Sequence, residues 1–387
     1  MKISEKVVEY MRIIFWFSLA VTVYVYAGYP LILAVLRRWA RLTYADENYL
    51  PTASLVIAAY NEEKVLHEKL QNSLALQYPR DRLEIVVASD GSTDATNVIV
   101  KAYKNNGIVL NEIEPRGGKA RALGLTVPKC RGEVVVLSDA NTMYRPDALK
   151  KLVRHFADPA VGAVSGDVQL VEAAPSYAKS EALYYRYERW LQTMESELGS
   201  IIGVDGGMYA LRRNLFHPPS VGLILDDFVI SMTVARSGHR VLYDPEAVAI
   251  EQGTLTSREE FRRKVRIVSG GMQALRRGEG LPRLRQPFLL FCYISHKLLR
   301  WFIPCFMVLL FLSSVLILES RWALLAFCGQ VLFYSAACMY ATGVRKFRQL
   351  TGSGIPYYFC LVNSAALVGL WKGLFQTSSG MWQRTTR

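Results

Sequence analysis

The chain has 387 residues, of which 51% are hydrophobic, and its formal net charge is +13 at pH 7. This length has room for more than one domain, so the hydrophobic runs decide the organisation better than length does. The positive charge does not indicate a nucleic-acid-binding protein, because it collects beside apolar runs and is not interleaved with stacking aromatics in a recognition module. The six cysteines show neither metal-binding nor disulfide spacing.

The first predicted element is a transmembrane helix over residues 13–36, a run without a charged side chain. At about 1.5 Å per residue, a helix of this length crosses the hydrocarbon core of a bilayer. The run is too long for the apolar part of a signal peptide and has no small-residue cleavage site before the charged segment that follows. We therefore expect an uncleaved membrane anchor.

A globular domain is expected over residues 50–285. Its first part alternates short apolar runs with helical stretches, which is typical of βαβ units and predicts an α/β fold with a parallel sheet. The expected strands are 54–59, 83–88 and 133–137, and the expected helices are 62–73, 94–105 and 119–127. Beyond residue 167 the pattern changes to an aromatic helix over 180–198, followed later by short strands over 241–243 and 247–250.

Polar residues that follow the strands are the candidate ligand-binding positions, because open α/β sheets bind ligands at the carboxyl ends of their strands. These residues are Ala59, Tyr60, Asn61 and Glu62 after the first strand, Asp90 after the second, and Asp139 with Asn141 after the third. Asp90 also has a plain structural explanation, since a turn followed by a helix cap uses the same residue types.

Asp139 and Asn141 form a candidate metal site. Because they lie two residues apart on an extended chain, their side chains point to one side. A carboxylate and an amide oxygen can share a hard divalent cation whose other ligands are phosphate oxygens and water. The alternative is an Asx turn before the following Arg-Pro pair.

Two basic clusters are candidate phosphate contacts. The segment Gly117–Arg121, which includes Lys119, combines backbone N–H groups, a helix start and two cations; a solvated helix start is its usual meaning. Arg263 and Arg266 lie three residues apart on a helix just before the membrane and would clamp a pyrophosphate. Their alternative explanation is a lipid-facing basic run.

Asp226 and Asp227 are adjacent carboxylates that follow a turn containing Gly203, Gly206 and Gly207. Their neighbours are apolar, so the pair requires partners or a raised pKa. A carboxylate of this kind is a candidate general base. For one of the two, an N-cap of the next helix is an equally good explanation.

The C-terminal part is expected to be membrane-bound. Residues 288–300 begin apolar but carry His296, Lys297 and Arg300, which predicts an amphipathic helix in the interface. Further transmembrane helices are expected over 301–318, 322–340 and 355–374. Lys and Arg beside these spans place the globular domain on the cytoplasmic face of a cell membrane, leave both termini outside, and favour attraction to anionic lipid.

In this order, the clusters resemble those of the membrane-bound processive-type glycosyltransferases of family 2. That group contains cellulose, hyaluronan and poly-N-acetylglucosamine synthases and ceramide glucosyltransferase. The resemblance covers about residues 50–300 with the flanking spans. It implies a GT-A nucleotide-sugar fold, a UDP-sugar donor, Mg²⁺ or Mn²⁺ as cofactor, and inversion of the anomeric centre.

The resemblance also implies roles for individual residues. Ala59 to Glu62 and Asp90 match the uridine-binding positions, and Lys119, Arg263 and Arg266 are implied donor contacts. Asp139 matches the first aspartate of the DxD metal motif, and Asp227 matches the general base that ends the TED or GDD triplet. Gly206 and Gly207, together with Asp226, fall on the acceptor side.

Two positions depart from the family pattern. Asn141 replaces the second DxD aspartate, which keeps an oxygen ligand but loses a charge. Of the family's Gln-x-x-Arg-Trp, only Arg266 is retained, and the absent tryptophan weakens the case for a long-polymer synthase. A glycan and a lipid stay open as acceptors, and the alternative from another class is a non-catalytic transporter subunit or scaffold with a degenerate nucleotide-binding domain.

Overall fold

Apolar strands form the centre of one eight-stranded sheet in the computed structural model, which describes residues 5–40, 44–171, 178–252 and 256–376. The strand order across the sheet is β3-β2-β1-β4-β7-β6-β8-β5. The strands are β1 (Ala53–Ala59), β2 (Leu83–Asp90), β3 (Ile108–Ile113), β4 (Val134–Asp139), β5 (Met143–Tyr144), β6 (Val161–Val171), β7 (Met208–Arg212) and β8 (Arg240–Gln252). Every residue of β1 is buried, as its unbroken apolar sequence requires.

The first four strands in space, β3, β2, β1 and β4, run parallel. Their register places Ala59 opposite Ser89, and Ala58 opposite Asp139. The carboxyl ends of β1, β2 and β4 therefore lie along one edge of the sheet. This arrangement confirms the three predicted strands and adds β3, whose partly exposed interior hides the pattern of a buried strand.

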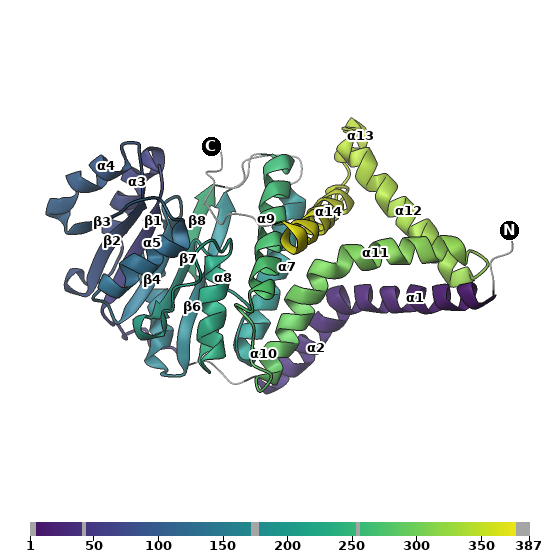
Figure 1. The fold of residues 1–387 in the computed structure, drawn as a ribbon, viewed down its shortest axis with the longest axis horizontal. Helices are drawn as coiled ribbons and strands as arrows, with labels where there is room; N and C mark the ends of the chain where they lie inside the picture. Colours follow the sequence, from purple (N-terminus) through teal and green to yellow (C-terminus); the bar gives the residue numbers. More distant parts are fainter. Residues whose placement is uncertain (1–4, 41–43, 172–177, 253–255, 377–387) are drawn as a thin grey trace.

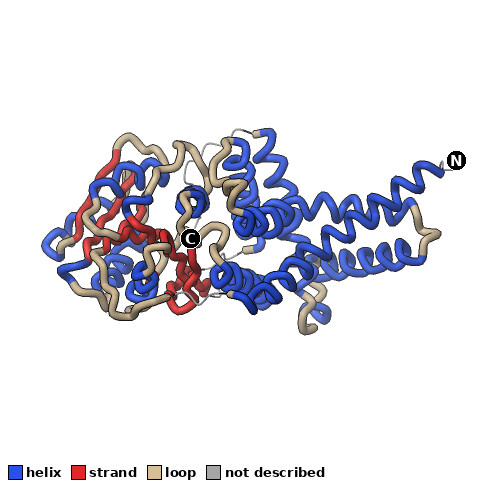
Figure 2. Tube along the Cα trace, turned by 90° about the horizontal axis from the view of Figure 1, so that it is seen from below, coloured by secondary structure: helices blue, strands red, loops and turns tan. Residues whose placement is uncertain are grey.

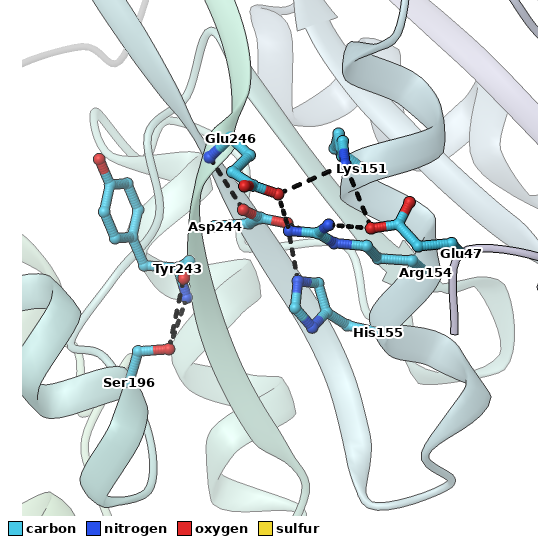
Figure 3. Close-up of polar contacts among 8 residues, drawn as sticks. All are labelled: Glu47, Lys151, Arg154, His155, Ser196, Tyr243, Asp244 and Glu246. Atoms are coloured by element: carbon cyan, nitrogen blue, oxygen red, sulfur yellow. Dashed lines mark hydrogen bonds and ion pairs between the residues drawn. The ribbon is translucent and has the colours of Figure 1, made fainter. Parts of the chain in front are cut away.

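The other half of the sheet is mixed. β7 runs antiparallel to both β4 and β6, whereas β6 and β8 are parallel. β8 is one long strand where two short ones were predicted, with a register shift against β6 between Tyr243 and Val248, where its charged side chains are paired. Asp244 lies 2.9 Å from Arg154 and 2.8 Å from His155, and Glu246 lies 2.6 Å from Arg154 (Figure 3).

Helices accompany the sheet, and all but the last of them pack against its strands. They are α3 (Glu63–Leu74), α4 (Thr96–Ala102), α5 (Lys119–Thr126), α6 (Ala148–Val153), α7 (Ala178–Leu198), α8 (Asp226–Arg236) and α9 (Ser257–Arg276). Alternate residues of β1 belong to different hydrophobic clusters: Val56 and Ala58 to one, Leu55 and Ile57 to the other. The sheet thus has apolar packing on both faces, as expected of a buried strand with a two-residue period.

Among the described residues, four helical segments are long and apolar enough to cross a membrane: Glu5–Trp39, Pro287–Leu316, Arg321–Ala341 and Gly354–Phe375. The first contains α1 (Glu5–Val23) and α2 (Tyr29–Leu36), and the second contains α10 (Pro287–Cys292) and α11 (Leu299–Leu316). The last two are α12 and α14, with the short α13 (Arg345–Arg348) between them. Figures 1 and 2 show these helices at one end of an elongated molecule, with α7 and α9 between them and the sheet.

One expectation about the C-terminal part needs correction. Residues 288–300 are helical, but they continue into α11 through a π-helical turn over Tyr293–Leu298 and do not form a separate helix. Two of the three polar residues that suggested an interfacial helix, His296 and Arg300, pair with α7 inside the protein. His296 is 4% exposed, and it lies 2.6 Å from Glu195 and 3.1 Å from Glu188, both on α7.

Candidate active site

Lys119 joins three of the predicted clusters at the carboxyl edge of the sheet. Its Nζ lies 2.6 Å from Oδ1 of Asp139 at the end of β4, and 3.8 Å from Oδ2 of Asp226 at the start of α8. The same Nζ donates to the carbonyl oxygen of Gly206 at 3.5 Å. Residues that are far apart in the sequence therefore surround one ammonium group.

The electrostatics of this cluster keep Lys119 charged. Burial alone would lower its pKa, but the carboxylates of Asp139, Asp226 and Asp227 outweigh burial and raise the pKa above its ordinary value. Asp226 is 8% exposed, and its Oδ2 makes no hydrogen bond. A buried carboxylate oxygen in this condition relies on the nearby cation for compensation.

Asp227 lies against the glycine turn. A Cβ added at Gly206 would collide with Oδ2 of Asp227, so the turn approaches this carboxylate closely because it has no side chain there. The backbone N–H of Phe228 donates to Oδ1 of Asp227 at 2.7 Å. Burial, followed by the negative charge of Asp226, raises the pKa of Asp227 to about 7.

The loop after β1 is locked to the loop after β2. Asn61 has a left-handed backbone with φ of 54°, and its side-chain oxygen accepts from the N–H of Thr93 at 2.8 Å. The N–H of Glu62 donates to Oγ1 of Thr96 at 2.8 Å. Ala59 is fully buried, so its contribution here is to position the polar residues that follow it.

Asp90 uses both carboxylate oxygens on the glycine pair. The N–H groups of Gly117 and Gly118 donate to Oδ1 and Oδ2 of Asp90 at 2.8 and 2.7 Å. The prediction that these two N–H groups bind a phosphate is therefore wrong, because they bind a carboxylate of the protein. Next to them, the guanidinium of Arg116 lies 3.6 Å from the ring centroid of Tyr60, a contact that no local sequence pattern indicated.

Asp139 and Asn141 fit a divalent cation that keeps water and phosphate ligands. The Asn141 amide donates through Nδ2 to Oε1 of Glu251 at 2.6 Å, which leaves its oxygen as the atom that can bind a cation. In the described part of the chain, no group of three His, Cys, Asp or Glu residues could hold a metal ion. One carboxylate and one amide are a donor set typical of Mg²⁺ or Mn²⁺ sites completed by substrate phosphates.

Sequence reasoning missed the residue that holds the glycine turn. Arg189 on α7 lies 2.8 Å from Oδ1 of Asp167 and 2.7 Å from Oδ2 of Asp205, which precedes Gly206. It also donates to the carbonyl oxygen of Val168 at 3.1 Å. A charged residue on an aromatic helix reads as a solvated side chain, so only the fold reveals this role.

The predicted pyrophosphate clamp is not a matched pair of arginines. Arg263 on α9 lies 2.7 Å from Oε2 of the buried Glu260 and also contacts Tyr185 on α7. Arg266 is exposed. One turn further along α9, Gly270 packs against Ile224 and Leu225, the residues just before the acidic pair. Arg266 thus lies on the same face of α9 as Gly270, which packs next to the acidic pair.

Known proteins share much of this sequence. The family model described as "Glycosyltransferase like family 2" matches residues 51–270. The poly-beta-1,6-N-acetyl-D-glucosamine synthase of Staphylococcus aureus is 26% identical over 231 residues, which are 58% of this chain and 55% of the relative. The protein of the same name from Staphylococcus epidermidis is 23% identical over 314 residues, 79% of this chain and 76% of the relative. The chain therefore spans about half the length of the first of these relatives.

A solved structure extends the similarity to the membrane helices. The mannosyltransferase PcManGT from Pyrobaculum calidifontis, in complex with GDP-Man and Mn²⁺, superposes with a TM-score of 0.70 at 23% identity. The match covers 94% of this chain and 99% of that protein. The expected α/β fold of GT-A type is thereby confirmed.

Proposed function

This chain belongs to glycosyltransferase family 2, and we propose that it transfers a sugar from a nucleotide-sugar donor to an acceptor hydroxyl, with inversion at the anomeric carbon. One observation carries the proposal. The Lys119 ammonium lies between the metal-site carboxylate Asp139 and the acidic pair, beside the turn at Gly206. A departing diphosphate requires a nearby cation, and deprotonation of a hydroxyl requires a nearby carboxylate, so the reaction needs both groups close together.

Asp227 is the proposed general base. Its pKa of about 7 matches a group that accepts a proton near neutral pH. As the acceptor hydroxyl gives its proton to Asp227, the oxygen attacks the anomeric carbon. The bond from that carbon to the diphosphate oxygen breaks, and the nucleoside diphosphate leaves with the electron pair.

Charge on the leaving diphosphate is balanced by Lys119, which its carboxylate neighbours keep protonated. Mg²⁺ or Mn²⁺ bound by Asp139 and Asn141 would supply further neutralisation of the phosphates. Asp139 therefore has two functions in the proposal: it binds the cation and orients Lys119.

The donor is proposed to be a UDP-sugar. Ala59 to Glu62 and Asp90 would contact the base and ribose, because they lie at neighbouring strand ends, where Asn61 accepts from Thr93 in the loop after Asp90. Arg266, and Arg263 beside it, would approach the diphosphate from α9. A GDP-sugar is the second donor class to test, since the mannosyltransferase with this fold was solved with GDP-Man.

The acceptor is proposed to be a glycan or a lipid. The names of the staphylococcal relatives favour a glycan. The position of α7 and α9 against the apolar helices suits a lipid equally well (Figure 1). In either case the catalytic domain would face the cytoplasm, where nucleotide sugars are present, with Gly206, Gly207 and Asp226 on the acceptor side.

The test is release of UDP or GDP by the detergent-purified protein across a panel of UDP- and GDP-sugars with Mg²⁺ or Mn²⁺. Asp227→Asn is the matched variant, because it keeps the shape of the side chain and removes the base. We expect turnover of one donor and a loss on the order of 10² to 10⁴ in the variant. Equal turnover by a folded Asp227→Asn protein would refute the assignment of the base.

Product analysis separates the acceptors. A single sugar on an extractable lipid identifies a lipid acceptor, and a product of many sugars identifies a growing glycan. A wild-type protein that binds neither nucleotide in the presence of either metal would favour the non-catalytic alternative.

A further inference from the structure

Lys69 on α3 is completely buried, with 0% of its surface exposed. Lysine almost never occupies such a position unless its ammonium is paired. Burial lowers the pKa of Lys69 to about 7, while the charge of Asp139 opposes this shift, so the amine depends on specific polar partners. These partners lie directly beside the proposed metal ligands.

The ammonium of Lys69 joins the two ends of the metal-binding segment. It donates to Oγ of Ser138 at 2.8 Å and also to the carbonyl oxygen of Thr142. Ser138 immediately precedes Asp139, and Thr142 immediately follows Asn141. The ammonium also lies 4.0 Å from the ring centroid of Tyr144, which gives it a further favourable contact.

A second residue of α3 holds the continuation of the same segment. Asn72 donates through Nδ2 to the carbonyl oxygen of Tyr144 at 2.9 Å, and its Oδ1 accepts from the N–H of Tyr144 at 2.9 Å. Lys69 and Asn72 are three residues apart and therefore lie on one face of the helix. From the opposite side, Glu251 accepts from the Asn141 amide.

We propose that Lys69 is a positioning residue for the divalent cation. It fixes residues 138–142 so that the Asp139 carboxylate and the Asn141 amide oxygen are held where one cation can bind both. The inference rests on the proposed function, because it requires a metal at Asp139. Lys69 makes no hydrogen bond to either ligand; it acts through Ser138 and the backbone of Thr142, and the charge of Asp139 favours its protonated form. Partners of this kind, one step removed from the metal, typically change metal affinity 10- to 100-fold.

The test measures Mn²⁺ binding by electron paramagnetic resonance, using the full chain in detergent with UDP or GDP present. Lys69→Met removes the ammonium while keeping an unbranched apolar side chain of similar length. We expect about 10- to 100-fold weaker Mn²⁺ binding, with metal-free nucleotide binding and the melting temperature little changed. Lys64→Met is the matched control, because Lys64 is exposed on the same helix, and it should bind Mn²⁺ as the wild type does.

Ser138→Ala is the second variant, and it decides the matter if Lys69→Met fails to fold. It removes one acceptor of the ammonium and leaves the lysine in place, so Mn²⁺ binding should weaken by a smaller factor. Folded variants that bind Mn²⁺ as tightly as the wild type would overturn this inference and leave the proposed function intact. So would a parallel loss of metal-free nucleotide binding, which would indicate a general structural role. A wild-type protein that binds Mn²⁺ with neither nucleotide would overturn the proposed metal dependence and this inference with it.

Discussion

The proposed donor half and the proposed acceptor half of the site are built in different ways. The donor half consists of β1, β2 and β4 with the loops that follow them, and its polar residues directly follow apolar runs in the sequence. The acceptor half consists of the turn 203–207, α7, the start of α8, and α9. Its geometry depends on pairs between distant segments, such as Arg189 with Asp167 and Asp205. Local sequence determines the positions of the polar residues in the donor half, whereas tertiary contacts determine the geometry of the acceptor half.

α7 connects the acceptor half to the apolar helices through two consecutive residues. Arg189 pairs with the aspartate before the glycine turn, and Glu188 lies 2.5 Å from Arg300 and 3.1 Å from His296. Along the same helix, Glu195 accepts from the hydroxyl of Tyr29 at 2.5 Å. The comparison predicts that changes in α7 alter acceptor use and stability while donor binding survives.

The largest effect is expected for Glu188→Leu. The substitution leaves the buried cation of Arg300 without its carboxylate, and breaking one side of such a pair typically costs about 3–5 kcal/mol. A lower melting temperature in detergent is the readout. Glu197→Gln is the control, because Glu197 pairs with Arg37 in an exposed position, where a loss of at most about 1 kcal/mol is expected. An unchanged melting temperature of Glu188→Leu would contradict the proposal that α7 ties the acceptor half to the apolar helices through Glu188.

The next largest effect is expected for Arg189→Met. Without the guanidinium the turn that carries Gly206 loses its anchor, and a small displacement of a reacting group can cost about 10²-fold in rate. Sugar transfer should fall by that factor, while UDP or GDP binding stays at the wild-type level. Arg186→Met, at an exposed position on the same helix, should transfer normally. Loss of nucleotide binding in Arg189→Met would contradict the separation of the two halves.

The pH dependence of transfer should report Asp227 in the proposed acceptor half. Burial and Asp226 raise the pKa of Asp227 to about 7, and a general base acts only when it is deprotonated. The transfer rate should therefore rise about tenfold per pH unit below pH 7 and level off above it, while nucleotide binding follows a different profile. A rate that is constant from about pH 5.5 to 8 would mean that Asp227 has the ordinary pKa of a carboxyl group.

The smallest effect is expected in the donor half, for Asn141→Asp. A second carboxylate adds one negative charge to the metal site, which is worth roughly 1 kcal/mol for a solvated pair at contact distance. Mn²⁺ binding in the presence of nucleotide should tighten by about fivefold. Asn106→Asp, at an exposed turn, is the charge-matched control. Weaker binding by Asn141→Asp would mean that repulsion from Glu251, which accepts from the Asn141 amide at 2.6 Å, outweighs the charge added at the cation.

Local sequence patterns predicted much of the fold. The continuous apolar runs that became β1, β2 and β4 were identified, because full burial on both faces leaves a clear signature. β3 was missed because its interior is partly exposed, and β8 was divided because Asp244 and Glu246 interrupt its apolar pattern. The helix expected in the interface proved continuous with α11, since its polar residues pair with α7.

By itself, the sequence determined which residues stand at the strand ends, the α/β class and the apolar helices, because burial and periodicity are recorded in neighbouring residues. Only the tertiary structure decided that Lys119 lies among the acidic clusters, that Arg189 anchors the glycine turn, and that Lys69 is buried beneath residues 138–142. A lysine or arginine has the same local pattern whether it is solvated or buried. Its role depends on which distant carboxylate, hydroxyl or carbonyl the folded chain brings to it.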